Sequence, residues 1–104
     1  MRVVRGAVLL LFLGLAASSA QAATDEEAKR LFMGGVQPAC MLCHALKAAG
    51  AEGAVGPSLD ELKPDAPRVV KALKNGIGQM PAFPQLSEAQ IQALARYIES
   101  TAGK

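Results

Sequence analysis

The residues best suited to chemistry in this chain lie in one short segment, Cys40-Met41-Leu42-Cys43-His44. Its pattern is C-x-x-C-H, which is typical of the covalent attachment of a c-type haem. Two thiols three residues apart can each add to one vinyl group on the same edge of a porphyrin. The adjoining imidazole is then placed to bind the iron. The pattern therefore predicts one haem c attached through Cys40 and Cys43, with His44 as an iron ligand.

Two other chemistries share part of this pattern. A thioredoxin-like dithiol also uses C-x-x-C, but it belongs to a βαβ framework of which the sequence shows no sign. A structural zinc site needs four ligands, whereas the chain has only two cysteines and one histidine. Both interpretations are therefore weaker than haem attachment.

An electron-transfer haem needs a sixth iron ligand, and a second histidine cannot supply it because His44 is the only one. The candidates are the thioethers of Met33, Met41 and Met80. Met41 lies inside the attachment segment, and Met33 closely precedes it, whereas Met80 follows His44 by 36 residues in an irregular segment. The usual role of a methionine is core packing. The sequence nevertheless predicts Met80 as the distal ligand, in the His/Met pairing expected of c-type haem.

The elements that must position these residues are short helices. Capping side chains precede each predicted helix, and glycines follow the first two. They are Thr24 with Glu27 and Gly34-Gly35 for the first helix, Asp65 and Gly76 for the second, and Ser87 with Gln90 for the last. Residues 75–84 are too rich in glycine and proline for regular structure. Because no strand alternation is visible, the predicted fold class is small and all-α, with three to four helices.

The first 22 residues differ in character from the rest of the chain. Arg2 and Arg5 give a positive start, residues 8–15 are apolar apart from Gly14, and Ala20-Gln21-Ala22 matches an A-x-A cleavage site. We therefore expect a cleaved signal peptide over residues 1–22, one domain over residues 23–104 and a periplasmic location. The alternative is a retained membrane anchor, but a spanning helix needs ~20 apolar residues.

Without residues 1–22 the chain has 82 residues, with nine basic and nine acidic side chains. A neutral domain has no electrostatic reason to bind nucleic acid or an anionic membrane. The whole chain contains only three Phe, one Tyr and no Trp, which is little material for a core. Domains of this size often need a disulfide, a metal or a cofactor, and a covalent haem would meet that need.

From Thr24 to Ala102 the chain resembles the small bacterial class I cytochromes c. The attachment segment, Gly56-Pro57 and residues 75–83 carry the resemblance. It implies a helical fold around one haem, with a Pro57 carbonyl that accepts a hydrogen bond from His44. It also implies a protein that shuttles single electrons between redox proteins and is not an enzyme.

The same resemblance implies how the first and last helices pack. Ala28 and Phe32 match the positions that cross the last helix at Leu94 and Tyr97. The family usually has Gly where Ala28 stands, so the crossing is expected to be slightly wider. No Trp is present to bind a haem propionate, which leaves three candidates open: Arg68, Lys71 and Gln79.

A narrower resemblance concerns the redox partners. Residues 57–66 and residues 75–83, here called the distal segment, resemble small cytochromes that accept electrons from periplasmic sulfite dehydrogenases. This implies a sulfite dehydrogenase as donor, and we expect another cytochrome or a terminal oxidase as acceptor and a monomer or weak dimer. The alternative function is a haem enzyme or gas-binding protein with a labile Met80, but no polar side chain in the distal segment suits acid–base chemistry.

The docking surface is expected where the attachment and distal segments meet around the haem edge. Its predicted centre is small and apolar, with lysines able to add positive charge around it. The predicted residues are Ala39, Met41, Pro81 and Ala82 at the centre and Lys47, Lys71 and Lys74 at the rim. Phe83 is expected in the core.

Overall fold

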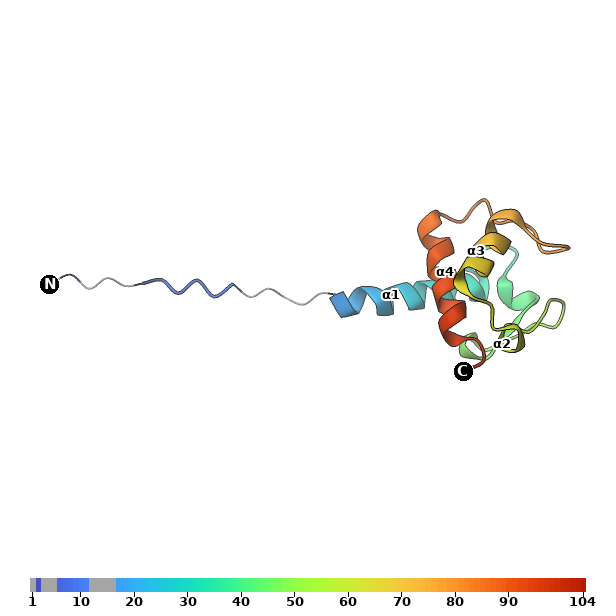
Figure 1. Ribbon diagram of the computed structural model, residues 1–104, viewed down its shortest axis with the longest axis horizontal. Helices are drawn as coiled ribbons and strands as arrows, with labels where there is room; N and C mark the ends of the chain where they lie inside the picture. Colours follow the sequence, from blue (N-terminus) through green and yellow to red (C-terminus); the bar gives the residue numbers. More distant parts are fainter. Residues whose placement is uncertain (1, 3–5, 12–16) are drawn as a thin grey trace.

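The structure is a computed structural model that describes residues 2, 6–11 and 17–104. Its elements are α1 (Ala17–Arg30), η1 (Leu31–Gly35), η2 (Cys40–Leu42), β1 (Ala45–Leu46), η3 (Lys47–Ala49), β2 (Ala51–Glu52), α2 (Leu59–Leu62), α3 (Ala66–Asn75) and α4 (Glu88–Thr101). Figure 1 shows α2, α3 and α4 gathered in one domain, with α1 leading into it from the N-terminal side. The predicted fold class, small and all-α, is confirmed.

The first helix begins earlier than the sequence predicted. We expected Thr24 to cap it, but α1 starts at Ala17, so Thr24 and Glu27 lie within the helix. The segment Ala17–Ala23 is rich in alanine, the strongest helix former, and this favours a helix that continues upstream. The predicted signal segment lies partly outside the described residues, which exclude Arg5 and residues 12–16.

No helix within the described part of the chain is long and apolar enough to cross a membrane.

The first and last helices form the centre of the core. Ala28, Phe32 and Leu94 are fully buried and Tyr97 is 5% exposed, as the predicted crossing requires. Helix α1 packs against α4, and α4 packs in turn against α3. Just after Phe32 the backbone of η1 leaves the helical conformation at Gly34, whose φ of 147° lies in a region that favours glycine. The chain thereby turns from the core toward the attachment segment.

The ends of α3 and α4 confirm the capping residues predicted from the sequence. The Asp65 carboxylate accepts a hydrogen bond from the Arg68 N–H at 2.9 Å, and α3 ends at Gly76 with φ 71°. Ser87 Oγ accepts from the Gln90 N–H at 3.1 Å, while Gln90 Oε1 accepts from the Ser87 N–H at 2.9 Å. These caps fix where the segment between α3 and α4 begins and ends.

A small hairpin and a short helix follow the attachment segment, and the sequence predicted neither. Strands β1 and β2 pair antiparallel through Ala45 with Glu52 and Leu46 with Ala51. Two-residue strands are too short to show an alternating pattern, and their turn depends on Gly50 at φ 65°. Helix α2 is only four residues long and is capped by Ser58.

Candidate haem site

The attachment segment folds as a tight turn that aligns the two thiols. Cys40–Leu42 form a 3₁₀ turn, and the N–H groups of Cys43 and His44 both donate to the Cys40 carbonyl, at 3.2 and 3.0 Å. Side chains three residues apart in such a turn lie one above the other. Cys40 and Cys43 are both half-buried and are not joined in a disulfide. They are therefore placed to bind one edge of a planar group.

The thiols are unsuited to the alternative chemistries. Burial raises the pKa of the Cys40 thiol to about 11, whereas a redox-active dithiol needs a lowered thiol pKa. The two-stranded antiparallel sheet is not a βαβ framework. Among the described residues, no group of three or more His, Cys, Asp or Glu side chains could hold a metal ion. The dithiol and zinc interpretations therefore have no structural support.

His44 makes the hydrogen bond that the family resemblance implies. Its Nδ1 lies 2.7 Å from the Pro57 carbonyl oxygen. Because a carbonyl can only accept, Nδ1 must carry the proton, and a neutral ring then keeps its lone pair on Nε2. Nε2 is the atom that a metal would use, and the hydrogen bond through Nδ1 fixes the ring orientation and strengthens it as a donor.

Two glycines allow the segment before Pro57 to approach the attachment segment closely. A Cβ on Gly56 would lie 2.7 Å from Cε1 of His44. A Cβ on Gly53 would lie 2.6 Å from the Met41 carbonyl oxygen and 2.7 Å from the main-chain nitrogen of His44. The Gly56 N–H also donates to the Cys43 carbonyl at 2.7 Å. Main-chain atoms rather than side chains therefore lie against His44 on this side.

The distal segment between α3 and α4 holds Met80 in a constrained turn. Ile77 and Met80 exchange main-chain hydrogen bonds of 3.0 and 2.9 Å. A Cβ on Gly76 would lie 2.8 Å from the Met80 carbonyl oxygen, so the turn closes tightly over this glycine. The Phe83 N–H donates to Leu73 of α3 at 2.8 Å, and Phe83 is buried as predicted. The Met80 side chain is partly buried and packs against the core.

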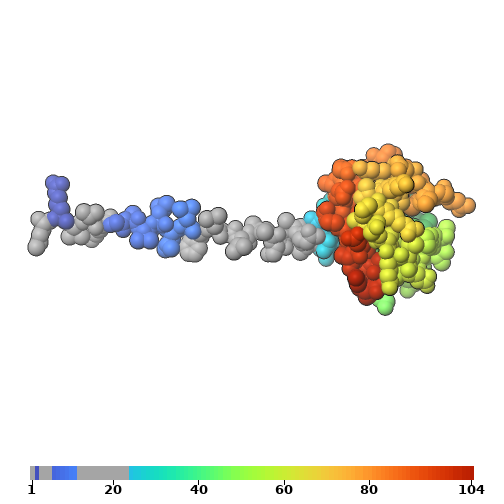
Figure 2. Space-filling model, viewed as in Figure 1, coloured from blue at the N-terminus to red at the C-terminus, as the bar shows by residue number. Residues whose placement is uncertain are grey.

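The fold brings the loop that precedes α2 and the distal segment to the same end of the domain. Figure 1 shows the segment between α3 and α4, and the loop that precedes α2, projecting away from α1. In the space-filling view of Figure 2 the segment between α3 and α4 forms a projecting edge on that same side.

The surface at this end differs in part from the predicted docking patch. Pro81 and Ala82 are exposed, but Ala39 is only 7% exposed and therefore cannot contribute to a docking surface. Large exposed apolar side chains that the sequence did not single out stand on the surrounding loops: Leu42 (62% exposed), Val55 (78%) and Ile77 (67%). These three residues belong to no periodic pattern in the sequence, so sequence reasoning could not have identified them as exposed.

The three lysines predicted at the rim are exposed, but one is already paired. Lys74 Nζ lies 2.8 Å from Glu88 Oε2. The local positive charge is therefore weaker than three free lysines would provide. Arg68, Lys71 and Gln79, the candidates for the haem propionates, are all exposed.

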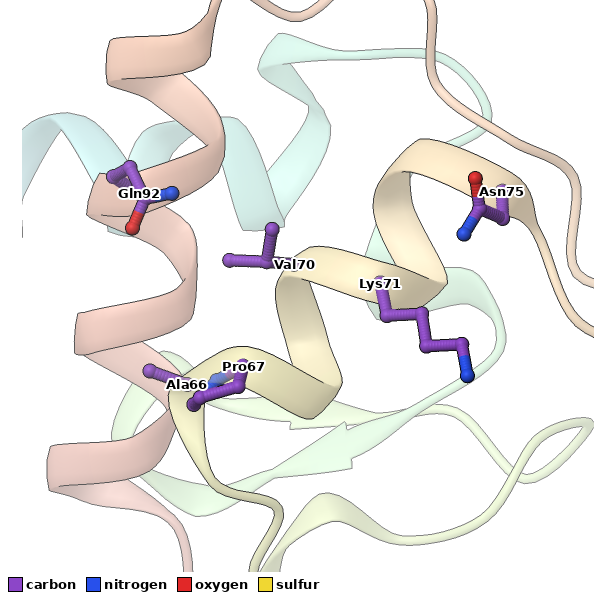
Figure 3. Close-up of a pocket in the computed structure, with 6 residues that line it drawn as sticks. All are labelled: Ala66, Pro67, Val70, Lys71, Asn75 and Gln92. Atoms are coloured by element: carbon purple, nitrogen blue, oxygen red, sulfur yellow. The ribbon is translucent and has the colours of Figure 1, made fainter.

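A pocket of about 450 Å³ lies between α3 and α4. Figure 3 shows its lining side chains on these helices: Ala66, Pro67, Val70, Lys71, Asn75 and Gln92. None of them belongs to the attachment segment, but Lys71 is a candidate for the haem propionates and Asn75 ends α3 at the start of the distal segment.

Comparison with known proteins agrees with the geometry. Residues 23–98 match the family model described as cytochrome C oxidase, cbb3-type, subunit III. The crystal structure of the c-type cytochrome SorU from Sinorhizobium meliloti is similar, with 47% sequence identity and a TM-score of 0.77 over 80% of this chain and 95% of that chain. No curated protein sequence matches the chain significantly. The chain belongs to the c-type cytochrome family and is a small class I cytochrome c.

The residues present fit the cofactor of this family. Two aligned thiols and an oriented imidazole with a free Nε2 are the groups that a covalent haem needs, and exposed apolar side chains stand on the loops beside them. The protein therefore carries haem c, attached through Cys40 and Cys43, and acts in electron transfer.

Proposed function

We propose that His44 and Met80 are the two axial ligands of the haem iron and that the protein is an electron carrier without enzymatic activity. The observation that carries this proposal is the 2.7 Å hydrogen bond from His44 Nδ1 to the Pro57 carbonyl, because it leaves Nε2 free to bind metal. The haem, when bound, supplies the one-electron redox chemistry. With both His44 and Met80 bound to it, the iron would offer no open position to a substrate.

The protein's own residues tune that chemistry by holding the ligands in place. Pro57 keeps the His44 ring oriented and makes it a stronger donor. The turn of Ile77–Met80 fixes the backbone of the thioether ligand, and a thioether ligand raises the reduction potential. A hydrogen bond to a main-chain carbonyl holds the His44 ring, and two main-chain hydrogen bonds hold the Met80 backbone, so both residues would keep their positions during electron transfer.

Replacement of Met80 tests the ligation. Met80→Ala should open the iron to carbon monoxide and lower the reduction potential, because the thioether that favours ferrous iron is lost. Absorption spectra of the reduced holoprotein with and without carbon monoxide measure the effect. Met33→Ala is the matched control, since Met33 is 36% exposed and should change neither property.

Two results would contradict this assignment. Carbon monoxide binding by the wild type to the same extent as by Met80→Ala would indicate an open or labile site, as in a ligand-binding haem protein. A large effect of Met33→Ala would move the ligand to the first helix.

We also propose that the protein is exported and that residues 1–22 are removed. The A-x-A sequence at residues 20–22 supports this, and the family match begins at residue 23. Mass spectrometry of the protein secreted into the periplasm should give a chain that starts at Ala23. Recovery of the full-length chain in a membrane fraction would instead support a retained anchor.

As its electron donor we propose a periplasmic sulfite dehydrogenase, and as acceptor another cytochrome or a terminal oxidase. The resemblance of residues 57–66 and of the distal segment to cytochromes that accept electrons from such dehydrogenases supports the donor. Electron carriers use small interfaces, below ~1,200 Å² in total, so binding should be weak and fast, without a permanent complex.

Stopped-flow reduction tests the donor and the docking surface together. Reduction by a sulfite dehydrogenase should be much faster than by an unrelated periplasmic dehydrogenase. Ala82→Glu should slow it because it places a charge in an exposed apolar surface, whereas Ala89→Glu at the exposed start of α4 should not. Equal rates with both dehydrogenases would contradict the donor. A loss of rate by orders of magnitude between low and physiological salt would contradict an apolar contact, because charge mainly sets association rate.

A further inference from the structure

The segment that carries His44 and the segment that supports it run side by side in one register. The Gly56 N–H donates to the Cys43 carbonyl at 2.7 Å, and His44 Nδ1 donates to the Pro57 carbonyl at 2.7 Å. A third bond runs from the Lys47 N–H to Asp60 Oδ2 at 2.8 Å. Each bond joins residues 13 apart in the chain, so residues 43–47 and 56–60 are parallel and held at both ends.

The acceptor of the third bond is the Asp60 side chain, which also reaches a distant part of the chain. Asp60 Oδ1 accepts from the Gly103 N–H at 2.9 Å, just beyond the end of α4. A Cβ on Gly103 would lie 2.9 Å from the Asp60 carbonyl oxygen, so the C-terminal residues lie directly against α2. These two N–H donors lower the pKa of the Asp60 carboxyl, which keeps it charged as a double acceptor.

We propose that Asp60 is a positioning residue for His44. Its carboxylate fixes residues 56–60 against residues 43–47 and against the C-terminus, and so holds the Pro57 carbonyl on His44 Nδ1. The inference rests on the proposed ligation of iron by His44. If the carboxylate is lost, the register can relax, the hydrogen bond to the histidine weakens, and the histidine becomes a poorer donor to the metal. A poorer donor favours ferrous iron and raises the reduction potential.

The experiment compares Asp60→Asn with Glu61→Gln in the holoprotein. Both variants remove one negative charge from adjacent positions of α2, where Asp60 is half-buried and Glu61 is exposed, so Glu61→Gln controls for the loss of a charge from this helix. In the wild type each carboxylate oxygen accepts from a different N–H, whereas Asn has one acceptor oxygen and an NH₂ group that cannot accept, so it cannot keep both bonds in this geometry. The oxidised-to-reduced ratio at a fixed applied potential should be several-fold lower for Asp60→Asn than for Glu61→Gln. A tenfold change corresponds to about 59 mV for one electron.

Proton NMR of the reduced holoprotein supplies a second readout. In Asp60→Asn the amide protons of Lys47 and Gly103 and the Nδ1 proton of His44 should exchange with solvent faster than in Glu61→Gln. If Asp60→Asn yields no folded holoprotein, Asp60→Glu, which keeps both acceptor oxygens on a longer arm, is compared with Glu61→Asp in the same way.

The possible failures can be told apart. Equal potentials in the two variants, or unchanged exchange of the His44 proton, would overturn the positioning role of Asp60 alone. Absence of a reversible one-electron couple in the wild type would instead overturn the proposed function, and with it this inference.

Discussion

Gly56 leaves no room for a side chain beside the His44 ring. A Cβ here would lie 2.7 Å from Cε1 of the ring, and the Gly56 N–H donates to the Cys43 carbonyl. Any side chain here would push the His44 ring away from the Pro57 carbonyl. The close contact explains why glycine precedes the proline whose carbonyl is used.

Gly56→Ala should displace the His44 ring, raise the reduction potential and lower the melting temperature of the holoprotein. The new Cβ would lie 2.7 Å from Cε1 of His44, closer than van der Waals contact allows. Thermal melting and redox titration measure both effects. Gly50→Ala is the control, because Gly50 has φ 65° and open space around it, so it should cost about 1–2 kcal/mol of stability without changing the potential. A Gly56→Ala protein with wild-type potential would show that the ring is not held as described.

Helix α4 is the element on which the rest of the domain is assembled. It packs against both α1 and α3, and its N-terminus closes the distal segment that carries Met80. The capping box of Ser87 and Gln90 therefore stabilises the helix and defines where the distal segment must end. Loss of this cap should destabilise both the start of α4 and the end of the distal segment.

Ser87→Ala should destabilise the protein by about 1 kcal/mol, since it removes the acceptor for the Gln90 N–H. Denaturant unfolding followed by far-UV circular dichroism measures the change. Ser100→Ala is a suitable control near the other end of α4, because the Ser100 hydroxyl only donates to the Tyr97 carbonyl within the helix. If both variants lose the same stability, the capping box has no special role.

The charges of the whole molecule set the range of pH in which it is stable. The Gly103 and Lys47 N–H groups lower the pKa of Asp60, and Lys74 and Gln92 lower that of Glu88. Burial raises the pKa of Tyr97, with smaller contributions from Asp25 and Glu26. A carboxyl group whose pKa is lowered by folding stabilises the fold at pH values above its pKa in the unfolded chain. That stabilisation is lost as the pH falls. A raised tyrosine pKa has the opposite consequence, because the unfolded chain ionises first as pH rises.

The melting temperature of the holoprotein should therefore fall below about pH 4 and again above about pH 10, near the ordinary values for Asp and Tyr. Tyr97→Phe should reduce the alkaline loss. Its hydroxyl is buried and has no hydrogen-bond partner within the described part of the chain, so its removal should cost little at neutral pH. An unchanged alkaline profile in Tyr97→Phe would assign that loss to other groups.

The sequence by itself determined the chemistry and the ends of the main helices, because both depend on residues a few positions apart. The spacing of Cys40, Cys43 and His44 indicates haem attachment wherever the segment lies. Asp65 and Ser87 cap their helices through contacts three residues away. In the full-length chain Thr24 does not start the first helix, because the local pattern cannot exclude a helix that continues upstream through the alanine-rich segment of residues 17–23.

Only the tertiary structure decided what lies against the histidine and what reaches the surface. The contact of His44 with Pro57 came from resemblance, and nothing in the local sequence predicts that Asp60 accepts from both Lys47 and Gly103. The burial of Ala39 and the exposure of Ile77 likewise depend on segments far apart in the chain. Such contacts depend on how distant segments pack and follow no local sequence pattern, so they appear only once the chain is folded.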